Sequence, residues 1–370
     1  MIELQEILNR VAVDDGEDSM LATLVDVQGS GYRLAGARML IDSNGKSIGT
    51  VSGGCLEVDI LERAKKVLRA GEPVVVSYDT TKDENSLFGL GMGCRGVVRV
   101  LLEPARENDA LAFIRSCFDR REKGVVSTLI SKTDDVSIEL ASRSYLGNDA
   151  FDRMHGTTLN GYSSQVARDA EAVMTENRSR SNTYDTDRGR AEFFHEIIKP
   201  PTAMLIFGAG HDAVPLARLA GRMGWRVSVI DHRSAWASAE RFPDAAELVV
   251  SRPEGIANEL FLDRESVAVV MNHNYDLDRE ILGRLLASCC RYIGMLGPRD
   301  RTERLLDELR AEGNRFEELQ LEKLYAPVGL DIGANTPEGI ALSIVAEIQS
   351  VLSGRKGGSL RHRQAPIYDR

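Results

Sequence analysis

The sequence lacks the features of membrane, secreted and nucleic-acid-binding proteins. None of its apolar runs reaches the roughly 18 residues that a membrane span requires. The chain starts with MIELQEILNR, which carries acidic groups and no basic region ahead of an apolar stretch, so we expect no signal peptide. The formal net charge of −10 leaves no general excess of basic groups for binding nucleic acid or anionic membranes.

Cysteine is also scarce. Five cysteines, an odd number in a chain of 370 residues, favour a reducing compartment over a disulfide framework, so we expect a cytoplasmic protein. With 43% hydrophobic and 28% charged residues, the composition is that of a globular chain long enough for two domains. The negative total charge still permits a local basic pocket for a phosphorylated ligand.

The clearest motif is the segment 204–213, MLIFGAGHDA. A short apolar run meets Gly208 and Gly210 and then a helical pattern, which is the strand–turn–helix opening of a nucleotide-binding βαβ unit. The first glycine permits the tight turn, and the second allows the backbone to approach a phosphate at the helix N-terminus. We therefore expect Gly208, Gly210 and His211 to contact such a ligand.

A second strand is expected at 225–230 (WRVSVI), and Asp231 follows it directly. An acid about twenty residues after the glycine turn is placed to bind a ribose hydroxyl. The alternative is that Asp231 is a turn residue or a helix N-cap. An acid here normally disfavours a 2′-phosphate, whereas Arg233 tolerates one, so the sequence leaves both NAD and NADP open.

In the N-terminal half, the glycine-rich loop 49–57 (GTVSGGCLE) carries a cysteine. It places Gly53, Gly54 and Cys55 at the start of a helical pattern, where the helix dipole and free N–H groups favour the thiolate form of a cysteine. Cys55 is therefore a candidate ligand of a metal or a sulfur centre. Its alternative role is that of a small hydrophobe buried among glycines.

A second glycine-rich stretch, 89–96, carries Cys94 next to Arg95, and the same two roles are open to this cysteine. Arg33 and Arg38 lie beside other glycine turns. They are either surface arginines or groups that bind an anion.

The strand expected at 267–271 leads into a polar loop with His273. Loops that follow parallel strands face the ligand in open α/β sheets, so His273 is a candidate acid–base group or metal ligand together with nearby aspartates. The alternative for Asp276 or Asp278 is that one of them caps the next helix.

Arg299 and Arg301 stand at the start of a further expected helix. The helix dipole disfavours a cation at this end, which is understandable if the arginines bind an anion such as a phosphate. Solvated surface arginines are the alternative.

Composition divides the chain into three parts. Residues 1–198 form the first domain, in which the stretch from about 145 to 190 is polar and expected to be irregular. Residues 199–352 form the second domain, and 353–370 a polar tail. We expect an α/β protein in which an α+β domain precedes a Rossmann-like, doubly wound parallel sheet.

Four strings carry a resemblance to a known family: GSGYRLAGARMLI, GTVSGGCLEVDI, GLGMGCRG and LIFGAGHDAVPLARLA. Together they resemble the XdhC/CoxI family, accessory proteins of molybdenum hydroxylases such as xanthine dehydrogenase and carbon monoxide dehydrogenase. The resemblance covers about 1–104 and 193–352. One departure is Arg95, where the family commonly has glycine, so the resemblance implicates Cys55 ahead of Cys94.

The resemblance implies an XdhC/CoxI-type N-terminal domain followed by a Rossmann domain, and a carrier rather than an enzyme. Family members bind molybdenum cofactor (molybdopterin), protect it while a cysteine desulfurase installs its sulfido ligand, and insert it into an apo-hydroxylase. A homodimer is expected as well. Two other hypotheses remain: an NAD(P)-dependent oxidoreductase with His273 as its acid–base group, and a scaffold whose nucleotide pocket is vestigial.

Overall fold

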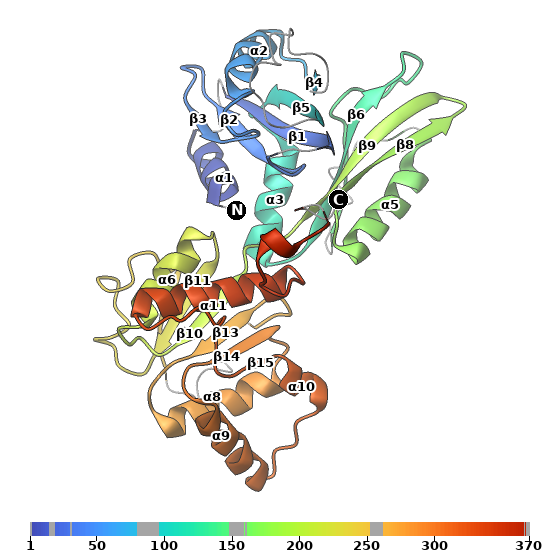
Figure 1. The fold of residues 1–370 in the computed structure, drawn as a ribbon. Helices are drawn as coiled ribbons and strands as arrows, with labels where there is room; N and C mark the ends of the chain where they lie inside the picture. Colours follow the sequence, from blue (N-terminus) through green and yellow to red (C-terminus); the bar gives the residue numbers. More distant parts are fainter. Residues whose placement is uncertain are drawn as a thin grey trace. The chain divides into compact units, whose positions relative to one another are not determined.

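The protein consists of two compact units, Met1–Pro200 and Pro201–Arg370. The computed structural model describes residues 2–14, 19–29, 32–79, 96–147, 159, 161–251, 262–365 and 367. In this part of the chain the first unit is built on antiparallel sheets and the second on one parallel sheet (Figure 1). The expected α/β class is thus confirmed. No helix among these residues has the length and apolarity needed to cross a bilayer.

The first sheet has five strands in the order β3-β2-β1-β5-β4, each antiparallel to its neighbours. Residues alternate between its faces with the period of two typical of strands: Met20 and Leu24 pack under helix α2, whereas Leu21 packs with helices α1 and α3. The elements are α1 (Ile2–Asp14), β1 (Met20–Gly29), β2 (Arg38–Ile41), β3 (Ser47–Gly49), α2 (Glu57–Ala70), β4 (Val74–Asp79), β5 (Gly96–Pro104) and α3 (Asp109–Arg120).

The second antiparallel sheet has four strands in the order β7-β6-β9-β8, and helix α5 packs on it. The elements are β6 (Gly124–Lys132), β7 (Arg143–Leu146), α5 (Ser163–Glu176), β8 (Arg180–Thr186) and β9 (Gly189–Ile198).

The expectation of an irregular region over 145–190 is corrected here, because α5 and β8 lie within it. Val166, Ala170 and Val173 follow the helical spacing and are buried, while polar residues cover the exposed face of the helix. A polar average concealed this narrow apolar stripe.

Ion pairs of arginine with glutamate connect the two antiparallel sheets. Arg38 of β2 donates from Nη1 to Glu196 of β9 at 2.7 Å, and only 4% of the arginine side chain is exposed. Its Nε is buried and has no hydrogen-bond partner among the described residues. Two further pairs between the sheets are Arg99–Glu192 and Arg143–Glu103. Because a buried charge is costly unless it is paired, each of these residues depends on its partner.

Both ring nitrogens of the buried His195 take part in hydrogen bonds. Tyr184 donates its single hydroxyl proton to Asp169 at 2.6 Å, so its oxygen accepts from Nε2 of His195 at 2.9 Å. Nδ1 of His195 then accepts from the hydroxyl of Ser127 at 2.8 Å. His195 is therefore neutral, and its burial lowers its pKa to about 4.

In the second unit, six parallel strands form a sheet in the order β12-β11-β10-β13-β14-β15. Numbered along the chain, this is 3-2-1-4-5-6, the order of dinucleotide-binding sheets. The elements are β10 (Ala203–Phe207), α6 (Ala213–Arg222), β11 (Arg226–Asp231), β12 (Glu247–Val250), β13 (Val267–Val270), α8 (Tyr275–Ala287), β14 (Tyr292–Met295), α9 (Arg299–Ala311), α10 (Glu318–Glu322), β15 (Leu324–Tyr325), α11 (Pro337–Leu352) and the 3-10 helix η1 (Leu360–His362).

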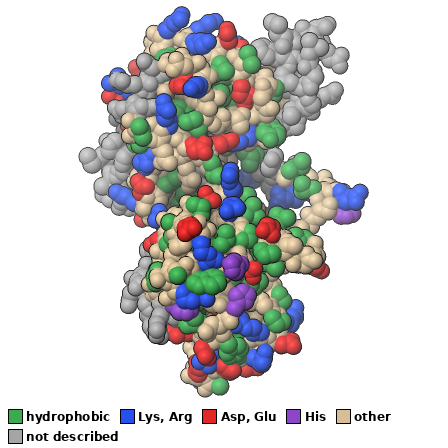
Figure 2. Space-filling view, turned by 90° about the vertical axis from the view of Figure 1, so that its left-hand side faces the viewer, with side chains coloured by type: hydrophobic (Ala, Val, Ile, Leu, Met, Phe, Trp, Pro, Cys, Tyr) green, Lys and Arg blue, Asp and Glu red, His purple; other side chains and the backbone are tan. Residues whose placement is uncertain are grey.

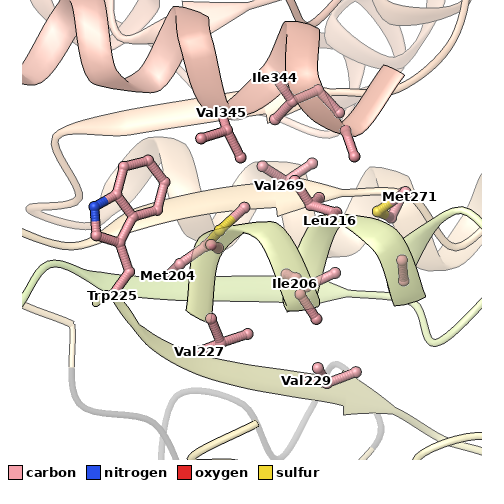
Figure 3. Packing of buried hydrophobic residues seen from close by; sticks show 14 of the residues in the cluster. Met204, Ile206, Leu216, Trp225, Val227, Val229, Val269, Met271, Ile344 and Val345 are labelled. Carbon is pink, nitrogen blue, oxygen red and sulfur yellow. The ribbon is translucent and has the colours of Figure 1, made fainter. Parts of the chain in front are cut away.

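Helices cover both faces of this sheet. On one face, Ile206 and Val269 pack against Leu216 of α6 and Ile344 of α11 (Figure 3). On the other, helices α8 and α9 cover the opposite side chains of the same strands. The central strands are buried on both faces, so the loops at the strand ends are left to bind ligands.

We predict that Glu196→Ala lowers the free energy of unfolding by roughly 3–5 kcal/mol, because it leaves Arg38 buried without its partner. The matched control is Glu3→Ala, which removes the partner of Arg33 in a pair whose side chains are 28% and 34% exposed. That variant is expected to lose less than about 1 kcal/mol. Urea denaturation measures both, and equal losses would contradict the prediction.

His195 is predicted to make stability depend on pH. Its folded-state pKa of about 4 lies below its ordinary value of 6.5, so below pH 6.5 the unfolded chain binds a proton that the folded chain excludes. Its contribution to stability is therefore lost as the pH falls from 6.5 toward 4, by about 2 kcal/mol at pH 5. Denaturation of the wild type and His195→Gln at pH 7 and pH 5 measures the difference, and identical pH dependence would contradict it.

Candidate functional site

The glycine turn lies at the carboxyl edge of the parallel sheet, between β10 and α6. Gly208 has a φ of 108°, and a Cβ there would lie 2.6 Å from the carbonyl oxygen of Met271. Only glycine fits such a close approach to the chain that leaves β13. Gly210 differs, because the nearest atom to its Cβ position is in His273 at 3.9 Å, so the space above it is open.

Unpaired backbone N–H groups follow this turn. Helix α6 begins at Ala213, and its N-cap Asp212 makes no side-chain capping bond. Among the described residues, the N–H groups of Gly210, His211 and Asp212 have no hydrogen-bond partner. Such groups at a helix N-terminus, together with the helix dipole, favour an anion.

The carboxylate of Asp231 is buried and fully engaged by this turn and the loop after β11. Oδ2 accepts from the N–H of Ala209 at 2.8 Å and from Nη2 of Arg233 at 2.8 Å. Oδ1 accepts from the N–H and from Nε of Arg233, each at 2.9 Å. Burial alone would raise the pKa of Asp231, but the hydrogen bonds from Arg233 and Ala209 outweigh it, so this pKa lies below the ordinary value.

Trp236 lies between two arginines beside the turn. The Arg233 guanidinium lies 4.4 Å from the ring centre and that of Arg241 lies 4.7 Å from it. Arg241 also donates to the carbonyl oxygen of Ala209 at 2.6 Å, and His211 meets the ring edge-on at 5.5 Å. Trp236 and Arg241 are not among the residues predicted from the sequence, although an aromatic residue with arginines nearby follows the second strand of this unit.

Exposed histidines lie in the loops at this edge: His211, His232 and His273. Figure 2 shows histidine (purple) and basic (blue) side chains gathered on one face of the second unit. The backbone of His273 is left-handed with a φ of 57°, and its Nε2 lies 3.6 Å from the Asp212 carboxylate. A side chain held in a rare backbone conformation and 62% exposed is available to a ligand.

The aspartates near His273 have a structural role. Asn274 caps α8 by accepting from the N–H of Leu277, so the expectation that Asp276 or Asp278 caps this helix is corrected. A short amide side chain provides the same acceptor as a carboxylate, and Asn274 occupies the N-cap position.

Asp278, in the first turn of α8, is instead buried and connects the loop after β13 to helix α9. It accepts from the amide of Asn272 at 3.0 Å and pairs with Arg301 at 2.8 Å. Arg299, by contrast, is exposed at the start of α9 and has no ion-pair partner among the described residues. Of the two arginines there, Arg299 is the one available to an anion.

In the first unit, Glu57 organises the loop that carries Cys55. Its carboxylate accepts from the hydroxyls of Thr50 and Ser52, from the N–H of Ser52 at 2.9 Å and from the N–H of Leu56 at 3.2 Å. Burial would raise the pKa of Glu57, but these hydrogen bonds outweigh it and hold the pKa below its ordinary value. The loop is thus shaped by an ionised side chain at the start of α2.

Cys55 is exposed on this loop, and its Sγ lies 3.6 Å from Oγ of Ser52. Gly54 has a φ of 105° and open space around its Cβ position, while the Cβ position of Gly53 lies 3.5 Å from the ring of Tyr32. The glycines let the chain turn sharply and leave the thiol uncovered by neighbouring side chains.

The remaining candidates of the first unit are not part of this loop. Arg38 is buried against Glu196, and Arg33 pairs with Glu3, so both guanidinium groups have internal partners. Cys94 lies outside the described residues. Within the part of the chain that the structure describes, no group of three or more His, Cys, Asp or Glu side chains is arranged to hold a metal ion.

Two protein-family models match the chain. The one described as "XdhC and CoxI family" matches residues 12–79, which include Cys55 and its loop. The one described as "XdhC Rossmann domain" matches residues 204–348, which include the glycine turn, Asp231 and His273. The two matches therefore cover the candidate residues of both units.

Relatives match nearly the whole length. A Bacillus subtilis protein named as a probable xanthine dehydrogenase subunit is 31% identical over 338 residues, which are 91% of this chain and 94% of the relative. "Molybdenum cofactor insertion chaperone PaoD" of Escherichia coli is 22% identical over 92% of this chain and 85% of its own. A crystal structure described as a xanthine dehydrogenase from Bacillus halodurans has a TM-score of 0.73 and 29% identity, covering 99% of this chain and 98% of the other. The chain therefore belongs to the XdhC and CoxI family.

Proposed function

We propose that this chain binds molybdenum cofactor and delivers it to an apo-form of a molybdenum hydroxylase. The names of its relatives, a molybdenum cofactor insertion chaperone and a probable xanthine dehydrogenase subunit, support this proposal. The proposed partners are the apo-hydroxylase and a cysteine desulfurase, and we propose that the carrier is a homodimer. When bound, the cofactor supplies the molybdenum centre that the hydroxylase uses.

The observation that carries the proposal is the exposed thiol of Cys55 at the start of α2. A thiolate is a soft ligand, suited to a metal centre with sulfur ligands. The loop fits this role, because Glu57 fixes the backbone while glycines leave the thiol open. Because this loop is already formed, little chain entropy is lost when its cysteine binds a metal centre.

The second unit contributes an anion site by itself. The N–H groups of Gly210, His211 and Asp212, which have no partner among the described residues, are suited to the phosphate that molybdopterin carries. His273 and Arg299 are exposed at the same edge and add hydrogen-bond donors for an anion. We assign no catalytic step to these residues, since a carrier has to bind and release its cargo unchanged.

The first test concerns Cys55. Wild type, Cys55→Ala and Cys289→Ala are purified from a host that makes the cofactor, and retained molybdopterin is measured by mass spectrometry. Cys289 is a matched control, because it is also an exposed free thiol. We expect Cys55→Ala to retain roughly tenfold less molybdopterin than the other two proteins. Equal retention by all three would show that Cys55 is not a ligand.

The second test compares the two glycines of the turn. Gly208→Ala is expected to lose at least about 2 kcal/mol of stability, because its φ is unsuited to a side chain and the new Cβ meets backbone. Gly210→Ala should change stability by less than about 0.5 kcal/mol but weaken binding of inorganic pyrophosphate about fivefold, because the methyl group covers the free N–H groups. Thermal unfolding and calorimetric titration measure the two effects. Wild-type affinity in Gly210→Ala would contradict the anion site.

A further inference from the structure

We propose that Arg233 determines which nucleotides the Rossmann unit accepts, by covering the Asp231 carboxylate that would otherwise bind a ribose diol. With the carboxylate covered, a ligand with a free 2′,3′-diol at this position, such as NADH, binds weakly, whereas a ligand with a phosphate there is preferred. This inference goes beyond the carrier function and does not depend on it.

Every acceptor position of the Asp231 carboxylate is occupied within the protein. An ionised carboxylate offers about four lone-pair positions. The N–H of Ala209 and Nη2 of Arg233 occupy those of Oδ2, and the N–H and Nε of Arg233 occupy those of Oδ1. The Asp231 side chain is 0% exposed. A ribose diol is bound by donating its hydroxyl protons to such a carboxylate, and no acceptor is left for it.

Arg233 is held in place by two neighbouring side chains. Its guanidinium makes a two-pronged bond to Asp231 and lies on the face of Trp236. The ring is fixed in turn, because Arg241 lies 4.7 Å from its centre and is itself held by donating to the carbonyl oxygens of Trp236 and Ala209. Moving Arg233 aside to admit a diol would break the charged hydrogen bonds and the ring contact together.

Arg233 still has a hydrogen-bond donor that a ligand can use. Its side chain is 38% exposed, and its Nη1 has no hydrogen-bond partner among the described residues. A free guanidinium N–H beside the carboxylate that would otherwise bind the ribose hydroxyls suits a phosphate monoester. Arg233 therefore makes this site recognise a phosphate in place of a diol. NADPH is expected to bind more tightly than NADH.

The test uses the full chain and dinucleotide titrations followed by tryptophan-to-nicotinamide energy transfer. Arg233→Met removes the guanidinium and keeps an aliphatic contact with Trp236. We expect NADH to bind this variant about tenfold more tightly than the wild type, and the preference for NADPH to disappear. Arg222→Met is the matched control, because it removes an exposed arginine of α6 and should leave both affinities unchanged.

Thermal unfolding establishes that each variant is folded. A double variant, Asp231→Ala with Arg233→Met, should lose the gained NADH affinity, because the acceptor is then absent. The proposal is overturned if folded Arg233→Met binds NADH no better than the wild type, including the case in which neither binds. It is also overturned if the double variant keeps the gain. Cofactor retention is not measured, so failure here is distinct from failure of the carrier function.

Discussion

One buried carboxylate determines the shape of the binding edge in the second unit. Asp231 ends β11, accepts from Ala209 in the glycine turn and binds Arg233 in the next loop. A buried carboxylate is tolerated only when donors surround it, so the strand end, the turn and the loop are constrained together. These donors also keep it ionised near neutral pH, since they hold the pKa of Asp231 below its ordinary value. The hydrogen bonds that shape the turn thus occupy the carboxylate oxygens that would otherwise accept from a ribose.

In the first unit, buried charged side chains pair with one another and so hold the two antiparallel sheets together. The pairs Arg38–Glu196 and Arg143–Glu103 connect the two sheets beside clusters of buried apolar side chains. Such pairs add specificity to sheet packing, because a shifted arrangement would leave a charge unpaired. The exposed thiol of Cys55 stands apart from these pairs, on a loop that its own helix organises. The buried ion pairs and the exposed thiol therefore lie on different segments of the chain.

Patterns along the chain predicted the α/β class, the parallel sheet and the glycine turn at its edge, because these depend on local spacing. They did not predict the partner of each charged group. Arg38 finds Glu196 at a separation of 158 residues, which only the packed sheets bring about. For Asp231 the partner is only two residues away, but the sequence left open whether Asp231 binds a ribose or a neighbouring group. The structure shows that it binds Arg233, whose guanidinium also lies over Trp236. The polar stretch containing α5 was misread because its average polarity masked a buried stripe.

The hydrogen bonds of Glu57 tie the shape of the Cys55 loop to the first turn of α2. Because Glu57 is the first residue of α2, the loop keeps its shape only while the first turn of that helix is formed. Helix ends open far more often than whole domains unfold, and they do so without disturbing the core. Local opening of this single turn would therefore loosen the loop around Cys55 while the rest of the unit stays folded. A ligand bound to the thiol, as proposed above, would then be freed by fraying of one helix end and without unfolding of the unit.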